Sequence, residues 1–345
     1  MKFSASMTLR EFARTIGPML ILLLDATPSQ ASRIVVLSDI HIKVNAEAPL
    51  GLERAIEETL RVKPDLVVLA GDMTSGNPGD GMSPGTVQSW WNGLKRSLHP
   101  LEQANIPILP IPGNHDWYTE AHRQAYRNAW PAPPAGVSIQ GLYPIQYIAH
   151  TPDAELFFLP IVDQVASRET VAFLRTHPKP SGSNHARIAF GHVPLASRMG
   201  RTNPSFQAGF GTELLNAGFS FYISGHEHLV WDESLPTATN PSALLRQLWV
   251  GTASGSYTFP IRQSLFNQHC LIPVPGVTTT LCTMPETQRT FRVRASDRSQ
   301  VLEQNFAIVL TGKDRKRPAS NPGLPEVELR GWDPDLKRWR DFYEP

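Results

Sequence analysis

Five short clusters of polar residues have the side-chain types and the spacing that metal-dependent chemistry requires. Each one places a carboxylate, an amide or an imidazole shortly after an apolar run. In chain order the clusters are Asp39-Ile40-His41, Gly71-Asp72, Gly113-Asn114-His115-Asp116, Gly191-His192 and Gly225-His226-Glu227-His228. Oxygen and imidazole ligands without a thiolate suit Mn²⁺, Fe or Zn²⁺ better than Mg²⁺ or Ca²⁺, and they argue against a structural zinc site. Taken singly, each cluster is also compatible with an ordinary turn.

The apolar runs before these clusters predict β-strands, because they are short and bounded by turn residues. The runs are Arg33 to Ser38, Leu66 to Ala70, Ile106 to Ile111, Arg187 to Phe190 and Phe219 to Ser224. Leu50 to Lys63 and Pro84 to Asn105 carry apolar residues at helical spacing and predict helices between the first three strands. An order of strand, helix and strand favours parallel pairing with right-handed crossovers. The polar clusters should therefore emerge at one edge of a sheet.

The rest of the chain predicts further elements by the same criteria. Helices are expected at Thr119 to Trp130 and Arg168 to Thr176; strands are expected at Ile145 to Ile148, Glu155 to Leu159, Leu245 to Val250, Thr290 to Arg294 and Phe306 to Leu310. The first two of these strands should form a hairpin in a second sheet. No ligand-like cluster occurs beyond residue 240.

The composition is that of a soluble globular protein without a strong overall charge. The chain has 345 residues, 41% of them hydrophobic, and its 32 basic and 31 acidic residues give a formal net charge of +1. This balance creates no field that would recruit nucleic acid or an anionic membrane surface, so the composition gives no support for a polyanionic partner. Cys270 and Cys282 lie in a Pro/Thr-rich segment without a CxxC pair, and they are either a disulfide or two free thiols.

The N-terminal segment has the order of a secretory signal peptide. Three basic residues, Lys2, Arg10 and Arg14, precede an apolar run and a small polar segment that ends at Ala31. The apolar run is shorter than the ~20 residues that a membrane span needs. We therefore expect a signal peptide at 1–31, a catalytic domain at 32–311 and a C-terminal tail at 312–345 packed on that domain. Export would place the mature chain in the periplasm or outside the cell without a membrane span; an N-terminal helix packed on the domain is the cytoplasmic alternative.

In their order, each following a predicted strand, the five clusters resemble the motifs of the calcineurin-like metallophosphoesterase superfamily. Those motifs run D-x-H, G-D, G-N-H-[DE], G-H and G-H-x-H, and the resemblance covers residues 33 to 230. It implies an α/β fold of four αββα layers, in which two mixed β-sheets face each other and helices flank them. It also implies two divalent metal ions, Mn, Fe or Zn, about 3.5–4 Å apart with a bridging hydroxide between them.

Matching motif to motif, the resemblance implies a role for each site residue. The first ion would be bound by Asp39, His41 and His228, the second by Asn114, His192 and His226, and Asp72 would bridge both ions. His115 would lie beside the phosphate as a general acid or as a stabiliser of transition-state charge. Asp116 would accept a hydrogen bond from His115 and keep it oriented and protonated.

Two departures from known branches narrow the function that the resemblance implies. Ser75 stands where purple acid phosphatases carry a tyrosine ligand, and Asp116 stands where their motif ends in glutamate. The Asp-ending form looks more like the bacterial phosphodiesterase branch. The expected function is hydrolysis of a small phosphate monoester or diester; the alternative is a metal-binding or scaffold protein that keeps the fold without turnover. The oligomeric state is left open by the motifs.

Overall fold

The computed structural model describes most of the chain between residues 32 and 253, together with short strands further on. The described residues are 32–42, 50–77, 82–183, 185–196, 203–228, 231–236, 244–253, 260–261, 294–296, 299–301, 306–311, 326–333 and 338–341. The chain divides into two compact units, Met1–Gln30 and Ala31–Pro345, and every described residue belongs to the second. The expected signal peptide, both cysteines and all but the last residue of the strand expected at Thr290 to Arg294 lie outside the described residues.

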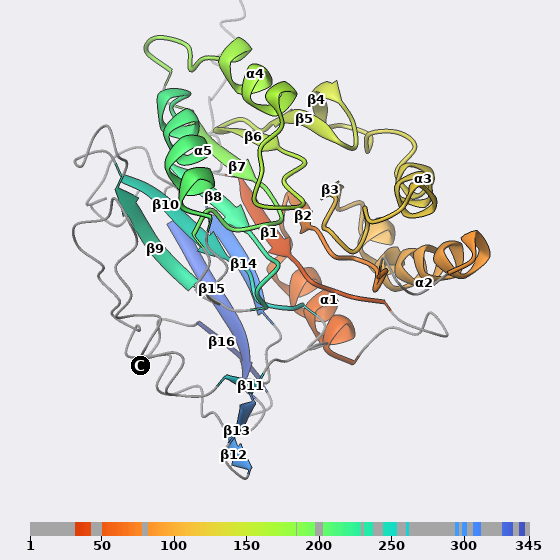
Figure 1. Ribbon diagram of the computed structural model, residues 1–345. Coiled ribbons are helices and arrows are strands. Elements are labelled where there is room, and N and C mark those ends of the chain that lie inside the picture. Colours follow the sequence, from red (N-terminus) through yellow and green to blue (C-terminus); the bar gives the residue numbers. More distant parts are fainter. Residues whose placement is uncertain are drawn as a thin grey trace, which may run out of the picture. The chain divides into compact units, whose positions relative to one another are not determined.

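The first sheet combines three parallel strands with an antiparallel extension (Figure 1). Its strands are β16 (Arg338–Asp341), β15 (Glu326–Asp333), β14 (Phe306–Thr311), β1 (Arg33–Leu37), β2 (Leu66–Ala70) and β3 (Ile108–Ile111), in that order across the sheet. The parallel register pairs Val36 with Val68 and Val68 with Leu109. The strand order confirms the predicted parallel pairing, and two stretches of the segment after residue 312 form β15 and β16 of this sheet.

The second sheet is also mixed. Across the sheet its strands are β4 (Ser138–Leu142), β5 (Gln146–His150), β6 (Ala154–Phe158), β7 (Ala186–Phe190), β8 (Phe221–Ser224), β10 (Leu244–Trp249) and β9 (Trp231–Pro236). The pairs β6–β7, β7–β8 and β8–β10 are parallel, and β5 and β6 form the predicted antiparallel hairpin. A small third sheet contains β11 (Pro260–Ile261), β13 (Ser299–Val301) and β12 (Arg294–Ser296).

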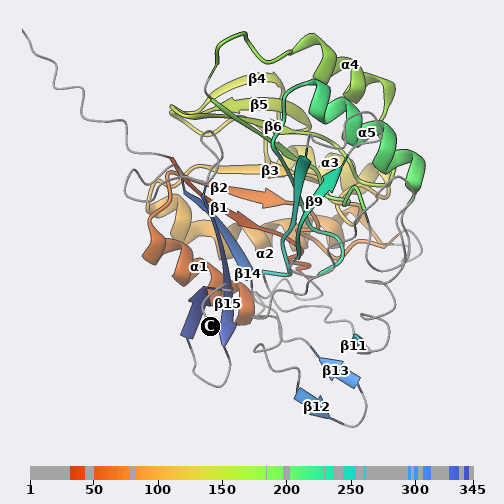
Figure 2. The same ribbon diagram turned by 90° about the vertical axis from the view of Figure 1, so that its left-hand side faces the viewer.

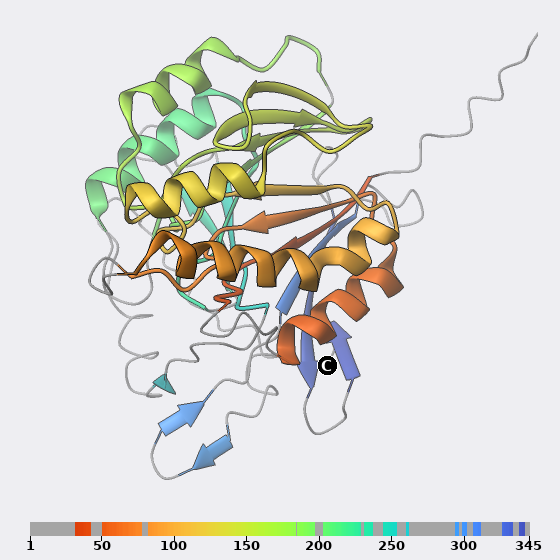
Figure 3. The ribbon, with the colours of Figure 1, turned by 90° about the vertical axis from the view of Figure 1, so that its right-hand side faces the viewer.

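Helices cover the outer face of each large sheet, so the fold has the predicted four αββα layers (Figure 2). The helices α1 (Leu50–Val62), α2 (Pro84–Gln103) and α3 (Glu120–Ala129) lie on the first sheet's side, where Figure 3 shows them side by side. The helices α4 (Arg168–Thr176) and α5 (Pro204–Asn216) pack on the second sheet. In the described part of the chain no helix is long and apolar enough to cross a membrane.

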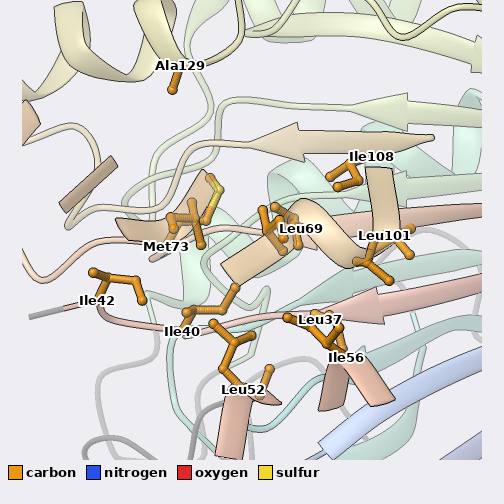
Figure 4. Packing of buried hydrophobic residues seen from close by; sticks show 14 of the residues in the cluster. Leu37, Ile40, Ile42, Leu52, Ile56, Leu69, Met73, Leu101, Ile108 and Ala129 are labelled. Carbon is orange, nitrogen blue, oxygen red and sulfur yellow. The ribbon is translucent and has the colours of Figure 1, made fainter. Parts of the chain in front are cut away.

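Side chains alternate between the two faces of the first sheet, so its central strands contribute to two hydrophobic cores. Val36 and Val68 point into the layer between the two sheets, whereas Leu37 and Leu69 point towards the helices. Figure 4 shows these leucines packed with residues of α1 and α2 such as Leu52. Because both faces are buried, the strands contain continuous apolar runs instead of an apolar and polar alternation. This double burial fixes the ends of β1, β2 and β3 in space.

Seven described elements were not predicted from the sequence, namely α5, β4, β9, β11, β13, β15 and β16. The helix α5 contains Gly209 and Gly211, and glycine is a poor helix former. The strands β4 and β9 lie at the two edges of the second sheet, and β4 is mostly exposed, so it lacks an apolar run.

Candidate metal centre

The five predicted clusters meet where the two sheets face each other. They follow the C-terminal ends of β1, β2, β3, β7 and β8. Two hydrogen bonds tie the sheets together at this place: His192 Nδ1 donates to the carbonyl oxygen of Ala70 over 2.9 Å, and the backbone amide of His226 donates to the carboxylate of Asp39 over 3.1 Å. All seven residues that were predicted as ligands therefore lie in one place.

The first group of possible ligands contains Asp39, His41 and His228, all buried. The Nε2 atoms of His41 and His228 are 3.1 Å apart, and His228 Nε2 is 3.3 Å from Asp39 Oδ1. Two imidazole nitrogens at this distance can share a single proton, or each can offer a lone pair to a cation. Together with a buried carboxylate, this donor set fits a divalent ion.

The second group contains Asp72, His192 and His226, with Asn114 beside them. His192 Nε2 is 3.0 Å from Asp72 Oδ2 and 3.1 Å from the amide oxygen of Asn114. That oxygen is also 2.9 Å from His226 Nδ1. Because Ala70 accepts the hydrogen of His192 Nδ1, Nε2 is the nitrogen that faces the group, as in imidazoles held for metal binding.

Asp72 belongs to the second group and also faces the first. Its Oδ2 atom is 3.0 Å from His192 Nε2 in the second group and 3.7 Å from His41 Nε2 in the first. The side chain is almost completely buried. A carboxylate with imidazoles on both sides is the arrangement that can bridge two neighbouring cations.

Left-handed backbone conformations hold these side chains in place. Of the seven non-glycine residues with a positive φ in the described chain, five belong to the site: Asp39 (52°), His41 (52°), Asp72 (51°), His226 (74°) and His228 (53°). Such conformations cost on the order of 1 kcal/mol or more each and are typical of functional sites. Residues two positions apart, such as Asp39 and His41, would share one face if the strand continued as far as His41. The strand β1 ends earlier, at Leu37, and the left-handed residues bring the two side chains together instead.

Two motif glycines are required because side chains approach the backbone closely. A Cβ atom at Gly113 would collide with the side chain of Asp72, and one at Gly225 would collide with Ser38 and Asp39. Gly113 is not among the residues with a positive φ, so a left-handed backbone is not the reason for a glycine at this position. Its role is therefore to leave room for the Asp72 carboxylate.

His115 lies at the open side of the site, with 22% of its side chain exposed. Its Nδ1 contacts the carbonyl oxygen of Gly76 at 2.5 Å, and its backbone amide donates to Asp72 Oδ1 over 2.8 Å. The Nε2 atom is 3.9 Å from Asp72 Oδ2, and the ring meets His41 edge to face at 4.8 Å. With Nδ1 facing a carbonyl, Nε2 is the nitrogen available to a substrate.

The predicted hydrogen bond between Asp116 and His115 is wrong. The completely buried carboxylate of Asp116 accepts hydrogen bonds from the backbone amides of Met73, Thr74 and Gly113 over 2.9–3.1 Å, and from the Thr74 hydroxyl over 2.9 Å. The imidazole of His115 is held by a carbonyl oxygen instead. Asp116 thus ties the loop after β2 to the turn after β3.

Except at His192, the protonation states favoured by the fold suit cation binding. Burial lowers the pKa of His41 to about 3 and that of His226 to about 4, so both imidazoles are neutral. Burial opposes ionisation of Asp39 and Asp72, but the neighbouring histidines, His228 and His192 first, lower both carboxyl pKa values overall. Burial lowers the pKa of His192, but Asp72 outweighs it and raises the value to about 9. A cation at the second group would therefore displace a proton from His192.

Sequence reasoning missed two residues that support the site. The hydroxyl of Tyr118 accepts a hydrogen bond from Asn114 Nδ2 over 2.6 Å, and the hydroxyl of Thr252 donates to the carbonyl oxygen of Asp39 over 2.7 Å. Tyr118 follows Asn114 by four positions in a turn, a spacing that could have suggested the contact. For Thr252 the sequence carries no signal, because the contact depends on how β10 returns to β1.

Comparisons with known proteins identify the family. A family model described as calcineurin-like phosphoesterase matches residues 32–230. The search of curated proteins found no match. A structure of GAP50, the anchor in the inner membrane complex of Plasmodium, has 11% identity and a TM-score of 0.48, covering 90% of this chain and 88% of its own. A dimetal phosphatase from Danio rerio has 12% identity and a TM-score of 0.40, covering 65% and 88%.

A third solved structure, that of a protein from Thermus thermophilus, has 9% identity and a TM-score of 0.39, covering 66% of this chain and 93% of its own. The family model alone spans more than half of the chain and contains all five polar clusters. The chain therefore belongs to the calcineurin-like phosphoesterase family.

Proposed function

We propose that this protein is a metal-dependent hydrolase that cleaves phosphate monoesters or diesters at a two-ion centre. The observation that carries the proposal is the position of Asp72, whose carboxylate faces His192 of the second group of metal-competent side chains and His41 of the first. Asp39, His41 and His228 would hold the first ion, Asn114, His192 and His226 would hold the second, and Asp72 would serve both. Such nitrogen and oxygen donors suit Mn²⁺, Fe or Zn²⁺.

Two divalent ions bound here would supply an activated water molecule and positive charge for the phosphate oxygens. The chain's own residues supply the remaining functions. Asp72 and Asp39 provide the negative charge that retains two dications in a buried site. The carbonyl oxygen of Ala70 keeps the His192 ring oriented. The side chain of His192 therefore loses little conformational freedom when it binds an ion.

His115 is proposed to act on the substrate itself. Its Nδ1 faces the carbonyl oxygen of Gly76, so a proton on that atom is retained and Nε2 is turned to the open side of the site. When the ring carries both protons, Nε2 can donate one to the leaving oxygen or hold it against a phosphate oxygen as negative charge develops. Both roles place the same atom beside the ester.

The test is a side-by-side assay of protein that has been stripped with a chelator and reloaded with Mn²⁺, Fe²⁺ or Zn²⁺. We expect hydrolysis of p-nitrophenyl phosphate, bis(p-nitrophenyl) phosphate or both, and a panel of phosphomonoesters, cyclic nucleotides and glycerophosphodiesters separates the substrate classes. His115→Ala is the matched variant, since it should keep both ions and lose most of the turnover. Protein that binds two ions and cleaves none of these esters would show that the fold serves as a metal-binding scaffold.

Export is a separate part of the proposal and rests on the sequence of residues 1–31 alone. Mass spectrometry of the native protein measures it directly. A mature chain beginning near Ser32 is expected, and an intact Met1 would contradict export through a cleaved signal peptide.

A further inference from the structure

We infer that Tyr118 is a positioning residue for the second ion, because its hydroxyl holds the Asn114 amide with the carbonyl oxygen turned towards that ion's position. The inference rests on the proposed function, since it assigns Asn114 to the second of two ions. Neither the sequence motifs nor the family comparison includes Tyr118 in a role.

The two ends of the Asn114 amide have different neighbours. Its oxygen is 3.1 Å from His192 Nε2 and 2.9 Å from His226 Nδ1, whereas its nitrogen donates to the Tyr118 hydroxyl over 2.6 Å. Only the oxygen of an amide is a ligand for a divalent ion, and the NH₂ group is a donor that repels one. The orientation seen here therefore presents the competent end to the histidines.

Tyr118 makes that orientation favourable by satisfying the other end of the amide. With the oxygen facing an ion, the NH₂ group points away from it and needs an acceptor in a partly buried place. The phenol oxygen of Tyr118 supplies that acceptor. Phenylalanine would leave the donor without it, and the amide could then turn its NH₂ group towards the histidines.

The local backbone explains why Tyr118 reaches Asn114. After β3 the chain makes a tight turn, in which the amide of Trp117 donates to the carbonyl oxygen of Asn114 over 3.2 Å. Tyr118 then lies one turn away on the same side, just before Thr119 caps the start of α3. Its ring contacts His115 edge to face, with centroids 5.2 Å apart and an angle of 73°. The ring thus has its own packing contact, and the hydroxyl can be removed without removing that contact.

Tyr118→Phe isolates the hydroxyl, and manganese titration followed by calorimetry and electron paramagnetic resonance measures both ions. We expect one of the two ions to bind about 10–100-fold more weakly, as is typical when a group that orients a ligand is lost, and the other to bind as in the wild type. Activity at low Mn²⁺ should fall and recover as Mn²⁺ reaches saturation. Tyr143→Phe is the matched control, because Tyr143 lies with Ile106 and Ile108 near the start of β3, whereas Asn114 follows the other end of that strand.

A double-mutant cycle with Asn114→Ala separates positioning from a general effect of the substitution. Once Asn114 is truncated, Tyr118→Phe should cause no further loss of affinity for the weaker ion. Three outcomes would each overturn the inference. Tyr118→Phe could leave the affinities for both ions unchanged, or it could weaken binding as strongly in the Asn114→Ala background as in the wild type. The wild-type protein could also bind fewer than two ions. A wild-type protein that binds two ions and cleaves no phosphate ester would instead overturn the proposed function, while the titration would still test Tyr118.

Discussion

Asp72 and Asp116 are two carboxylates in neighbouring loops of one site, both buried, yet the fold treats them in opposite ways. Asp72, at the end of β2, is surrounded by the imidazoles of His192, His41 and His115, and although burial opposes ionisation these rings lower its pKa. Asp116, in the turn after β3, accepts hydrogen bonds from neutral amides and a hydroxyl. Burial, with the charge of Asp72, raises the pKa of Asp116 to about 6.

The difference shows that burial alone does not determine what a carboxylate does. The imidazole rings around Asp72 can offer nitrogen lone pairs to a cation, and Asp72 can offer its negative charge. This carboxylate is therefore suited to binding the cation that the reaction needs. The backbone amides around Asp116 donate their hydrogens to its carboxylate and cannot bind a cation. This carboxylate therefore ties two loops together. The comparison predicts that changes at Asp72 affect activity first and changes at Asp116 affect stability first.

The largest expected effect is that of Asp72→Asn on activity. The neutral amide can no longer bridge two cations, and its NH₂ group would face one of them. Because losing a group that merely orients a ligand costs 10–100-fold, we expect kcat/KM to fall by more than about a hundredfold. Steady-state kinetics and metal analysis measure this, with Asp163→Asn on the exposed surface as the control. If Asp72→Asn kept its turnover and still bound two ions, the proposed bridging role of Asp72 would be wrong.

Asp116→Asn should reduce stability more than activity. The NH₂ group of asparagine would face amide hydrogens that now donate to Oδ1 or Oδ2 of Asp116, leaving buried donors without an acceptor. We expect the free energy of unfolding to fall by about 1–3 kcal/mol in urea titrations of chelator-treated protein. The proposed difference between the two carboxylates would be wrong if Asp116→Asn had the unfolding midpoint of the wild type. It would also be wrong if this variant were as stable as the wild type but a hundredfold less active.

The pH dependence of that difference in stability follows from the direction of the Asp116 pKa shift. Its carboxyl pKa in the folded protein, about 6, lies above the reference value of 3.8, so its contribution to stability is complete below about pH 3.8 and is lost as the pH rises through about 6. In ion-free protein the stability gap between wild type and Asp116→Asn should therefore narrow between pH 4 and pH 6 and stay constant above. Urea titrations across this range measure the gap. If the stability difference between wild type and Asp116→Asn widened with rising pH, the pKa of Asp116 would be lowered by folding and not raised.

The smallest expected effect is that of Thr74→Val, which removes one of the four hydrogen bonds to Asp116 and keeps the shape of the side chain. The free energy of unfolding should fall by about 1 kcal/mol at neutral pH, because the backbone amides remain. Thr176→Val, at an exposed position, is the control. A loss as large as that of Asp116→Asn would mean that the hydroxyl, and not the amides, holds the carboxylate.

The amino-acid sequence determined the order and type of most elements of the fold. The helix predicted at Arg168 to Thr176 has those bounds in the structure, and the one predicted at Pro84 to Asn105 ends two residues earlier, at Gln103. Long apolar periodicities and terminal prolines are local signals, so they survive folding. The same holds for the polar clusters, because a strand end followed by glycine and a metal-competent side chain is a local pattern.

Only the tertiary structure decided which groups those side chains contact. The sequence placed Asp116 next to His115 and suggested a bond between them, but folding brought the amides of the loop after β2 closer to the carboxylate. It likewise brought Thr252 to Asp39 and Tyr118 to Asn114. Hydrogen-bond partners are selected by distance in space after the sheets have packed. Adjacency in the sequence therefore predicts which residues enter this site better than it predicts what each one binds there.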